Sequence, residues 1–255
     1  MERVASFKAC VASLALLGSA CAASAAPAPA PCADIKAATT VLGTSRTLSL
    51  PREAAAYGRV QHGPLPLQPG EVVLTFDDGP QPGSTPQVLQ ALAAQCVQAT
   101  FFMNGESLRA APALGRQVRD AGHTVAMHGY RHPHFASMPE AEQLADLSAM
   151  QAVFEHTLGR PAAAWRFPFL EETPALRAEL KAQKITVMSV DLGLDDWLPD
   201  QSPAMLTERL LARLKDTGGG IILLHDAQVQ TATALPMMLK ALQTHGYRVV
   251  HLRWD

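Results

Sequence analysis

Long hydrophobic runs, aromatic side chains and an excess of basic charge are all scarce in this sequence of 255 residues. Beyond the N-terminal residues, no segment reaches the roughly 18 consecutive apolar residues that a membrane-spanning helix needs, so we expect no transmembrane segment. The formal net charge is -2, which predicts no binding to nucleic acid. Aromatic residues make up 5% of the chain and offer few platforms for a long binding groove. With 48% hydrophobic residues the chain can bury one sizeable core, and we expect a monomer.

The N-terminal residues have the features of an export signal. Arg3 and Lys8 precede the apolar residues 9–17, and a small-residue cleavage site follows at 23–25. We therefore expect a signal peptide over residues 1–25 and an exported protein, periplasmic or secreted. Lipid anchoring at Cys21 is less favoured, because the preceding leucine lies one position too far upstream of it. Residues 26–69 are expected to form an Ala/Pro linker and N-terminal extension, and residues 70–255 one globular domain.

Removal of the signal would leave Cys32 and Cys96 as the remaining cysteines. An exported protein meets oxidising conditions in which such a pair can form a disulfide. Cys96 closes the helix that starts near Thr85, so the bridge would hold the N-terminal extension against that helix. The alternative is a small buried Cys96 and a free Cys32 thiol.

From residue 71 onward, apolar runs typical of strands alternate with segments whose apolar residues follow helical spacing. This alternation predicts parallel strands and right-handed crossovers in an open or closed α/β barrel. Seven strands are expected, over 72–76, 99–103, 123–127, 164–167, 185–190, 221–224 and 247–252.

Helix starts are indicated by capping residues. A hydroxyl residue followed by proline predicts starts at Thr85, Thr173 and Ser202. Ser137 and Glu140 have the spacing of a capping box for another helix.

Polar residues follow the expected strands at the points where those strands end. In α/β barrels, the loops after the C-terminal ends of strands build the site, so these residues are expected to share one rim. They are Asp77, Asp78, His128, Arg166, Asp191 and His225.

The adjacent carboxylates of Asp77 and Asp78 precede a Gly-Pro turn. Two carboxylates tolerate one small volume if a cation binds one while the other stays free as a base. A solvated turn is the alternative, because Asp, Gly and Pro are common turn residues.

His128 and His132 are four residues apart, which brings both imidazoles to one side if their loop makes a helical turn. Two histidines and a carboxylate leave open positions for water, as in catalytic zinc sites, and non-haem iron uses the same ligands. We therefore expect a divalent metal, with zinc favoured. Two solvated histidines are the alternative, and His134 is expected at the surface.

Arg166 lies in an otherwise apolar stretch, where a buried guanidinium needs a carboxylate partner, and Asp77 is the candidate. The alternative is an arginine that ties two loops together. His225 ends an apolar strand, where a single histidine is usually structural. An acidic and aromatic cluster, for which an exposed loop is the alternative, consists of Asp191, Asp195, Asp196 and Trp197.

Together these motifs resemble those of the polysaccharide deacetylases, the NodB-homology carbohydrate esterases. The resemblance covers residues 70–253 and implies a distorted (β/α)7 barrel, in agreement with the expected strands. The motifs, in the family's order, are Thr75-Phe76-Asp77-Asp78-Gly79-Pro80, His128-x-x-x-His132, Arg166-x-Pro168-Phe169, Asp195-Asp196-Trp197 and Leu223-Leu224-His225-Asp226.

The resemblance implies a role for each matching residue. The metal ligands would be Asp78, His128 and His132. The catalytic residues would be Asp77 as general base, Arg166 orienting it, His225 as general acid, and Asp196 tuning His225, with Asp191 and Asp195 as competitors. The substrate-binding residues would be Phe169, Trp197 and Leu223.

Two positions depart from the family pattern. Phe169 stands where tyrosine is common, but its backbone amide would still serve the oxyanion. Gly129 stands where Ser or Thr usually braces the metal loop, which favours looser metal binding. Gly129→Ser should then tighten the metal site, unless Gly129 has a positive φ that serine cannot adopt.

The implied function is metal-dependent hydrolysis of N-acetyl groups, or of O-acetyl esters, on an acetylated polysaccharide or oligosaccharide outside the cell or in its envelope. The alternative is a carbohydrate-binding member of the same fold with weak or no catalysis, which Gly129 supports. Chitin oligomers, peptidoglycan, poly-N-acetylglucosamine and acetylated xylan remain open as substrates.

Overall fold

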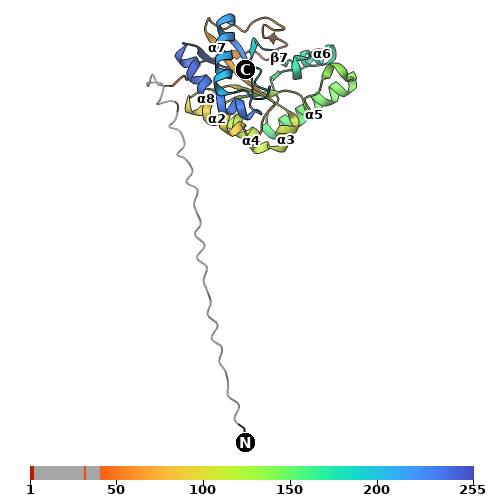
Figure 1. The fold of residues 1–255 in the computed structure, drawn as a ribbon. Coiled ribbons are helices and arrows are strands. Elements are labelled where there is room, and N and C mark those ends of the chain that lie inside the picture. The colour runs from red at the N-terminus through yellow and green to blue at the C-terminus, as the bar shows by residue number, and fades with distance from the viewer. Residues whose placement is uncertain (3–31, 33–40) are drawn as a thin grey trace.

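The computed structural model describes residues 1–2, 32 and 41–255. Within this part, helices surround a central parallel sheet (Figure 1). Residues 3–25 of the expected signal peptide, Cys21 included, lie outside the described residues, as does the linker through residue 31. No helix in the described part is long and apolar enough to cross a membrane.

The sheet contains all seven strands predicted from the sequence and three that were not predicted. The unpredicted strands are β1 (Thr44–Leu50), β2 (Ala56–Tyr57) and β8 (Leu192–Gly193). The predicted strands are β3 (Glu71–Asp77), β4 (Thr100–Met103), β5 (Thr124–Met127), β6 (Ala164–Trp165), β7 (Thr186–Met188), β9 (Gly220–His225) and β10 (Arg248–Trp254).

Helices and short 3-10 turns join these strands over residues 77–248. The helices are α2 (Thr85–Ala94), α3 (Gly105–Ala110), α4 (Pro112–Asp120), α5 (Glu140–Leu158), α6 (Pro174–Ala182), α7 (Pro203–Thr217) and α8 (Val229–Thr244), and the turns are η1 (Phe135–Ser137) and η2 (Pro168–Leu170).

Every strand pairing is parallel among the described residues, and β3 is central because it pairs with β4, β9 and β10. Around the barrel the neighbours follow the order β2-β7-β6-β5-β4-β3-β9-β8, and β10 with β1 branches from the start of β3. The structure therefore confirms the α/β barrel predicted from alternating strands and helices, in the distorted form that the family resemblance implies.

Two of the predicted helix starts are confirmed, and the start at Thr85 is displaced. Thr173 and Ser202 cap α6 and α7 by accepting a backbone N–H three residues later, at 3.4 and 3.2 Å. The N-cap of α2 is Ser84, one residue before the predicted cap. Thr85 is instead the first residue inside α2, where its hydroxyl accepts the Gln81 N–H at 2.8 Å and donates to the buried carboxylate of Asp226.

The predicted capping box of α5 is wrong. Pro139 is the N-cap, and Ser137 belongs to the preceding 3-10 turn. Ser137 lies two residues before the N-cap, and its hydroxyl donates to the carbonyl oxygen of His134 at 2.8 Å. Gly159 ends α5 in the left-handed conformation, as is common after a helix.

Strand alternation determines which side chains of β3 face the barrel interior. Val72, Leu74 and Phe76 pack in the core between sheet and helices. Val73 packs in the smaller core inside the barrel, together with one residue from most other strands. Because side chains alternate along a strand, Thr75 and Asp77 share the inward face with Val73. Asp77 therefore enters the barrel at its C-terminal mouth.

Part of the N-terminal extension belongs to the sheet. β1 pairs with β10 from Thr44↔Val249 to Leu50↔Trp254, and β2 pairs with β7. Burial alternates along β1, whereas every residue of β3 is buried. A continuous apolar run such as that of β3 predicts an interior strand, and β1 has no such run. The predicted Cys32–Cys96 disulfide is confirmed, with Cα atoms 5.6 Å apart.

Candidate active site

The ends of neighbouring strands bring the predicted site residues together. Asp77 ends β3 and His225 ends β9, and the two are direct partners in the strand register. His128 follows β5, and Arg166 follows β6. These residues share the rim that the barrel topology predicts.

Asp78, His128 and His132 form a cluster of potential metal ligands. One ligand atom from each lies within 4.8 Å of the other two. An Asp78 carboxylate oxygen is 3.6 Å from Nε2 of His128 and 3.3 Å from Nε2 of His132. His128 contacts the carbonyl oxygen of Arg166 through Nδ1 at 2.9 Å, which fixes the ring and leaves Nε2 for a metal.

The electrostatic environment also fits a metal. Burial lowers the pKa of His128 to about 3, so the imidazole is neutral and able to coordinate a cation. Asn104 donates its side-chain N–H to the Asp78 carboxylate at 3.2 Å and helps to orient it. Two imidazole nitrogens and one carboxylate oxygen suit a divalent metal that keeps further positions for water and substrate.

The two histidines converge without the predicted helical turn. Their ring centroids are 5.0 Å apart, but His132 has φ 56°, in the left-handed region. Pro133 follows His132 and disfavours the right-handed helical conformation there. The predicted convergence is confirmed, and its predicted local geometry is wrong.

Asp146 of α5 braces the metal loop, a role that the sequence did not indicate. Its buried carboxylate accepts the backbone N–H of Tyr130 at 2.7 Å and that of Arg131 at 3.2 Å. These amides lie between the two histidine ligands. The only sequence signal for Asp146 is an acid on the buried stripe of an otherwise apolar helix face.

Gly129 has φ 82°. Its substitution by serine was expected to tighten the metal site only if this φ were not positive, so that condition is not met. A side chain there would be strained, and its Cβ would lie 3.3 Å from Cγ of Pro168. Gly129→Ser is therefore not expected to tighten the metal site, and Asp146, whose carboxylate would lie 3.6 Å from that Cβ, already holds the loop.

Asp226 holds the loop after β3 and was also not assigned a role from the sequence. Its buried carboxylate accepts the Gly79 N–H at 3.1 Å and the Thr85 hydroxyl. A Cβ on Gly79 would lie only 2.0 Å from that carboxylate, so only glycine fits. Burial raises the pKa of Asp226 to about 7, and the nearby charges of Asp78 and Asp77 add to the increase.

Asp77 is paired with Arg166, as the sequence predicts. The guanidinium donates to the Asp77 carboxylate and to the Thr75 hydroxyl, at 2.7 and 2.8 Å, and lies 4.1 Å above the Phe102 ring. Both members of the pair are buried. Burial raises the pKa of Asp77, and the charge of Arg166 opposes that increase.

His225 is paired with Asp196, which resolves the alternatives left open by the sequence. The Asp196 carboxylate lies 2.8 Å from Nδ1 of His225 and accepts that residue's backbone N–H at 2.8 Å. The predicted place of Asp191 on the rim is wrong, because Asp191 accepts the backbone N–H of Ile221 near the start of β9. Asp195 pairs with Arg213. Burial lowers the pKa of His225, but the hydrogen bond and charge of Asp196 outweigh it and raise the value to about 9.

Aromatic and apolar side chains border the rim. Trp197 and Phe169 are half-exposed, and Trp197 meets the His225 ring edge-on, with centroids 5.4 Å apart. Phe169 contacts His132 and stacks on the exposed His134, with centroids 4.4 and 3.9 Å away. Leu223 lies two residues before His225 on β9, on the same face of that strand.

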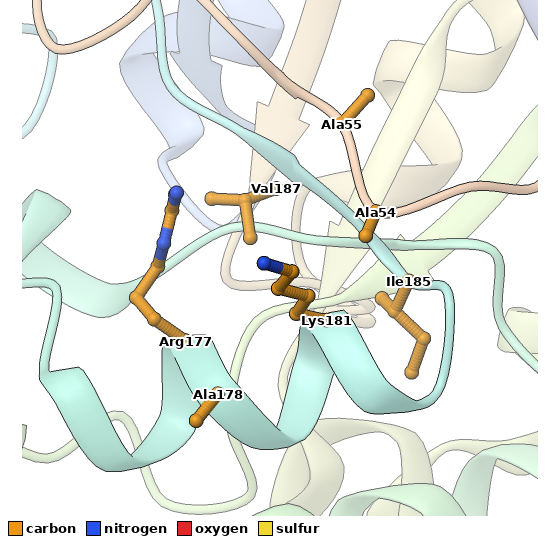
Figure 2. A pocket seen from close by; sticks show the side chains of 7 residues that line it. All are labelled: Ala54, Ala55, Arg177, Ala178, Lys181, Ile185 and Val187. Atoms are coloured by element: carbon orange, nitrogen blue, oxygen red, sulfur yellow. The ribbon is translucent and has the colours of Figure 1, made fainter.

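A separate hollow lies between α6 and the segment that leads into β2 (Figure 2). Its volume is about 230 Å³, and the side chains of Arg177 and Lys181 extend from α6 toward Val187. None of the predicted site residues lines this hollow, so it does not belong to the candidate active site.

Comparison with known proteins identifies the family. Residues 66–188 match the family model of polysaccharide deacetylases. The chain is 30% identical over 202 residues to the chitooligosaccharide deacetylase of Azorhizobium caulinodans, covering 69% of this chain and 90% of that relative. The chain therefore belongs to the polysaccharide deacetylase family.

Two further relatives cover less of their own length. The peptidoglycan-N-acetylglucosamine deacetylase of Listeria monocytogenes is 33% identical over 180 residues, which are 70% of this chain and 37% of that relative. The solved structure of a Bdellovibrio bacteriovorus peptidoglycan deacetylase has a TM-score of 0.75 at 31% identity, covering 84% of this chain and 60% of that one. This chain thus spans little more than a third of the Listeria protein.

Proposed function

We propose that this protein is a metal-dependent deacetylase that hydrolyses N-acetyl groups of an exported or envelope polysaccharide. The observation that carries the proposal is the position of Asp77 and His225 beside the Asp78, His128 and His132 cluster. Asp77, paired with Arg166, and His225, paired with Asp196, are thus two titratable groups at one potential metal site. The relatives named above, deacetylases of peptidoglycan and of chitooligosaccharide, support the same substrate class.

Each residue would have one task in the reaction. A divalent metal held by Asp78, His128 and His132, with zinc as the first candidate, would supply Lewis acidity toward the acetyl carbonyl and water. Asp77, oriented by Arg166, accepts the proton of the attacking water. The backbone N–H of Phe169 donates to the oxyanion, and Trp197 and Leu223 border the acetyl group.

His225 then completes the cleavage of the carbon–nitrogen bond. Asp196 keeps its imidazole protonated, so it can give a proton to the departing nitrogen. A neutral amine leaves far more readily than an amide anion, which is why a second titrating group is needed opposite the base. The products are acetate and the free amino sugar. An O-acetyl ester would place less demand on His225 and is the nearest alternative substrate.

A metal titration followed by acetate release tests this function. We expect Zn²⁺ to bind and to restore acetate release from one or more of chitin oligomers, peptidoglycan, poly-N-acetylglucosamine and acetylated xylan. The Asp77→Asn variant is the control for metal-catalysed background. Metal and glycan binding without acetate release would favour the carbohydrate-binding alternative and overturn the proposed catalysis.

A further inference from the structure

A cavity lined by arginines lies at the end of the barrel opposite the candidate active site. It borders Thr124, where β5 begins, and Ala163, which precedes β6, whereas the site residues follow the other ends of these strands. Its volume is about 220 Å³. Four guanidiniums line it, those of Arg52, Arg119, Arg160 and Arg253.

These arginines are held close together with little compensating charge. Arg52 donates to the carbonyl oxygen of Pro161 at 3.2 Å, and Arg119 to that of Leu158 at 2.9 Å, which anchors both side chains. Within residues 41–255, the ion pairs include one for Arg119, with the exposed Asp120, and none for Arg52, Arg160 or Arg253. Asp255 lines the cavity and is the one acidic residue among its lining residues.

Like charges surround Arg160 in this cavity. Burial lowers the pKa of its guanidinium, and the charges of Arg119, Arg253 and Arg52 lower it further. An anion within the cavity would relieve this repulsion and accept several charge-assisted hydrogen bonds. The cavity is smaller than the roughly 300 Å³ at which pockets for drug-sized ligands begin, so it suits one compact anionic group.

We propose that the arginine cavity, lined by Arg52, Arg119, Arg160 and Arg253, binds a phosphate group. Guanidiniums that approach from several elements match a tetrahedral anion with several acceptor oxygens better than a planar carboxylate, which one arginine can satisfy. The phosphate would come from free phosphate or from a phosphodiester polymer. This site is independent of the proposed deacetylase function.

Calorimetry with inorganic phosphate at low ionic strength tests this site. We expect saturable binding of one phosphate, weakened about tenfold or more in Arg160→Ala and in Arg253→Ala, since each loses a charge-assisted hydrogen bond. Arg109→Ala, which removes an exposed arginine of α3 outside the cavity, should bind as the wild type does. Absent or non-saturable binding, or equal loss in Arg109→Ala, would overturn the proposal.

Two more measurements extend this test. Without phosphate, Arg160→Ala should raise the melting temperature at low salt, because it removes repulsion among the arginines. A lower melting temperature in that variant would count against the repulsion argument and the site. A glycerol-phosphate oligomer that binds more tightly than free phosphate would identify the polymer as the source, and equal affinities would identify free phosphate.

A different observation concerns residues 57–62, here called the strap, which precede the residues that match the family model. The strap runs along the end of β7: the carbonyl of Tyr57 accepts the Ser189 N–H at 2.7 Å, and the Val60 N–H donates to Val190 at 3.0 Å. Gly58 permits this approach, because a Cβ there would lie 2.5 Å from the Ser189 backbone. The strap is therefore fitted closely against the rim.

Gln61 of the strap joins the two loops that support Asp77 and Phe169. Its side chain donates to the Leu170 carbonyl at 2.7 Å and accepts the Ser189 hydroxyl at 2.8 Å. The Ser189 carbonyl in turn accepts a hydrogen bond from Arg166 at 3.1 Å. Phe169 and Leu170 both have left-handed φ values, 55° and 58°, which persist only where surrounding contacts hold them.

We infer that Gln61 is a positioning residue for the backbone amide of Phe169 and for Arg166; this inference rests on the proposed function. Gln61→Met keeps the side-chain length but removes both hydrogen bonds. We expect kcat to fall roughly three- to tenfold, as for one or two lost hydrogen bonds, with KM and metal affinity unchanged. Amide hydrogen exchange at Leu170 and Glu171 should become faster.

The control is Gln87→Met, which alters an exposed glutamine of α2 that bonds only locally to Gly83. Wild-type kcat and wild-type exchange in Gln61→Met would show the inference to be wrong. If the wild-type enzyme releases no acetate from any substrate, the proposed function fails, and the exchange comparison still decides whether Gln61 holds the loop.

Discussion

Asp77 and Asp78 are adjacent in the chain but have different neighbours, because strand alternation directs Asp77 into the barrel. Asp77 is buried against Arg166, whereas Asp78 is partly exposed and lies beside both histidines. The like charges of the two carboxylates are thus divided between a guanidinium and a potential metal site. This division would allow Asp77 to act as the proposed base and Asp78 as the proposed metal ligand.

We predict that substitutions at these two residues separate metal binding from turnover. Asp77→Asn should keep its metal and lose about 100-fold or more in kcat, because it cannot accept a proton. Asp78→Asn should lose about 100-fold or more in metal affinity, because an amide is a poor metal ligand. Elemental analysis and acetate release distinguish them. A metal-free Asp77→Asn protein would show that this residue is a ligand.

A second prediction concerns Asp146, which is not itself one of the potential metal ligands. Asp146→Ala should weaken metal binding about 10- to 100-fold, as is typical when support of a metal ligand is lost, because the Tyr130 and Arg131 amides lose their acceptor. Asp120→Ala, an exposed acid on α4, serves as the charge-matched control. Calorimetric metal affinity equal to that of the wild type would mean that the loop is held by other contacts.

A third prediction concerns how stability and activity depend on pH through His225. Its pKa is raised to about 9 from an unfolded value near 6.5. The raised pKa therefore stabilises the fold fully below about pH 6.5, and this contribution is lost as the pH rises through about 9. The protonated acid should likewise persist to alkaline pH, while deprotonation of Asp77 sets the acid limb of activity.

Removing the charge of Asp196 tests this assignment. In Asp196→Asn the burial of His225 is no longer offset, so the alkaline limb of kcat/KM should move down by about one pH unit or more. A bound cation lowers the pKa of His225 in both enzymes, so the two metal-loaded profiles are compared with each other. An alkaline limb at the same pH in both would exclude Asp196 as the group that sets the pKa of His225.

At the scale of elements, continuous apolar runs predicted the seven main strands correctly, and capping residues predicted the starts of α6 and α7. β3 is the best example, because its uninterrupted apolar residues are buried on both faces. β1 was missed because its alternating residues are half-exposed, and β2 and β8 have two residues each, too few for a periodic signal. The capping box at Ser137 failed because α5 begins later, with Pro139 as its N-cap.

The same limit applies to the site. The proposed metal ligands and the two proposed proton-transfer residues stand in motifs at strand ends, and the resemblance of these motifs to those of the family pointed to them. Asp146, Asp226 and Gln61 act through contacts with segments distant in the chain, and Gln61 lies 109 residues before its partner Leu170. Such supporting residues depend on tertiary packing, which local patterns do not contain.

At the scale of the whole molecule, the N-terminal extension is tied to the barrel in three places. β1 and β2 pair with opposite ends of the strand order, and the Cys32–Cys96 bridge fixes the chain further upstream. Cys96 follows the C-terminal end of α2 and precedes β4, so the bridge lies away from the rim that carries the candidate active site.

We therefore predict that loss of the disulfide lowers stability and leaves catalysis intact. The bridged cysteines are 64 residues apart, and a loop of that size corresponds to about 4 kcal/mol of unfolding free energy in the chain-entropy model, with smaller values common in practice. Cys32→Ser/Cys96→Ser should melt roughly 5 to 15 °C below the oxidised protein and release acetate at the wild-type rate. The wild type with reductant should melt like the variant, and non-reducing mass spectrometry should recover the linked peptide pair. Equal melting temperatures with and without reductant would mean that strands β1 and β2 alone hold the extension in place.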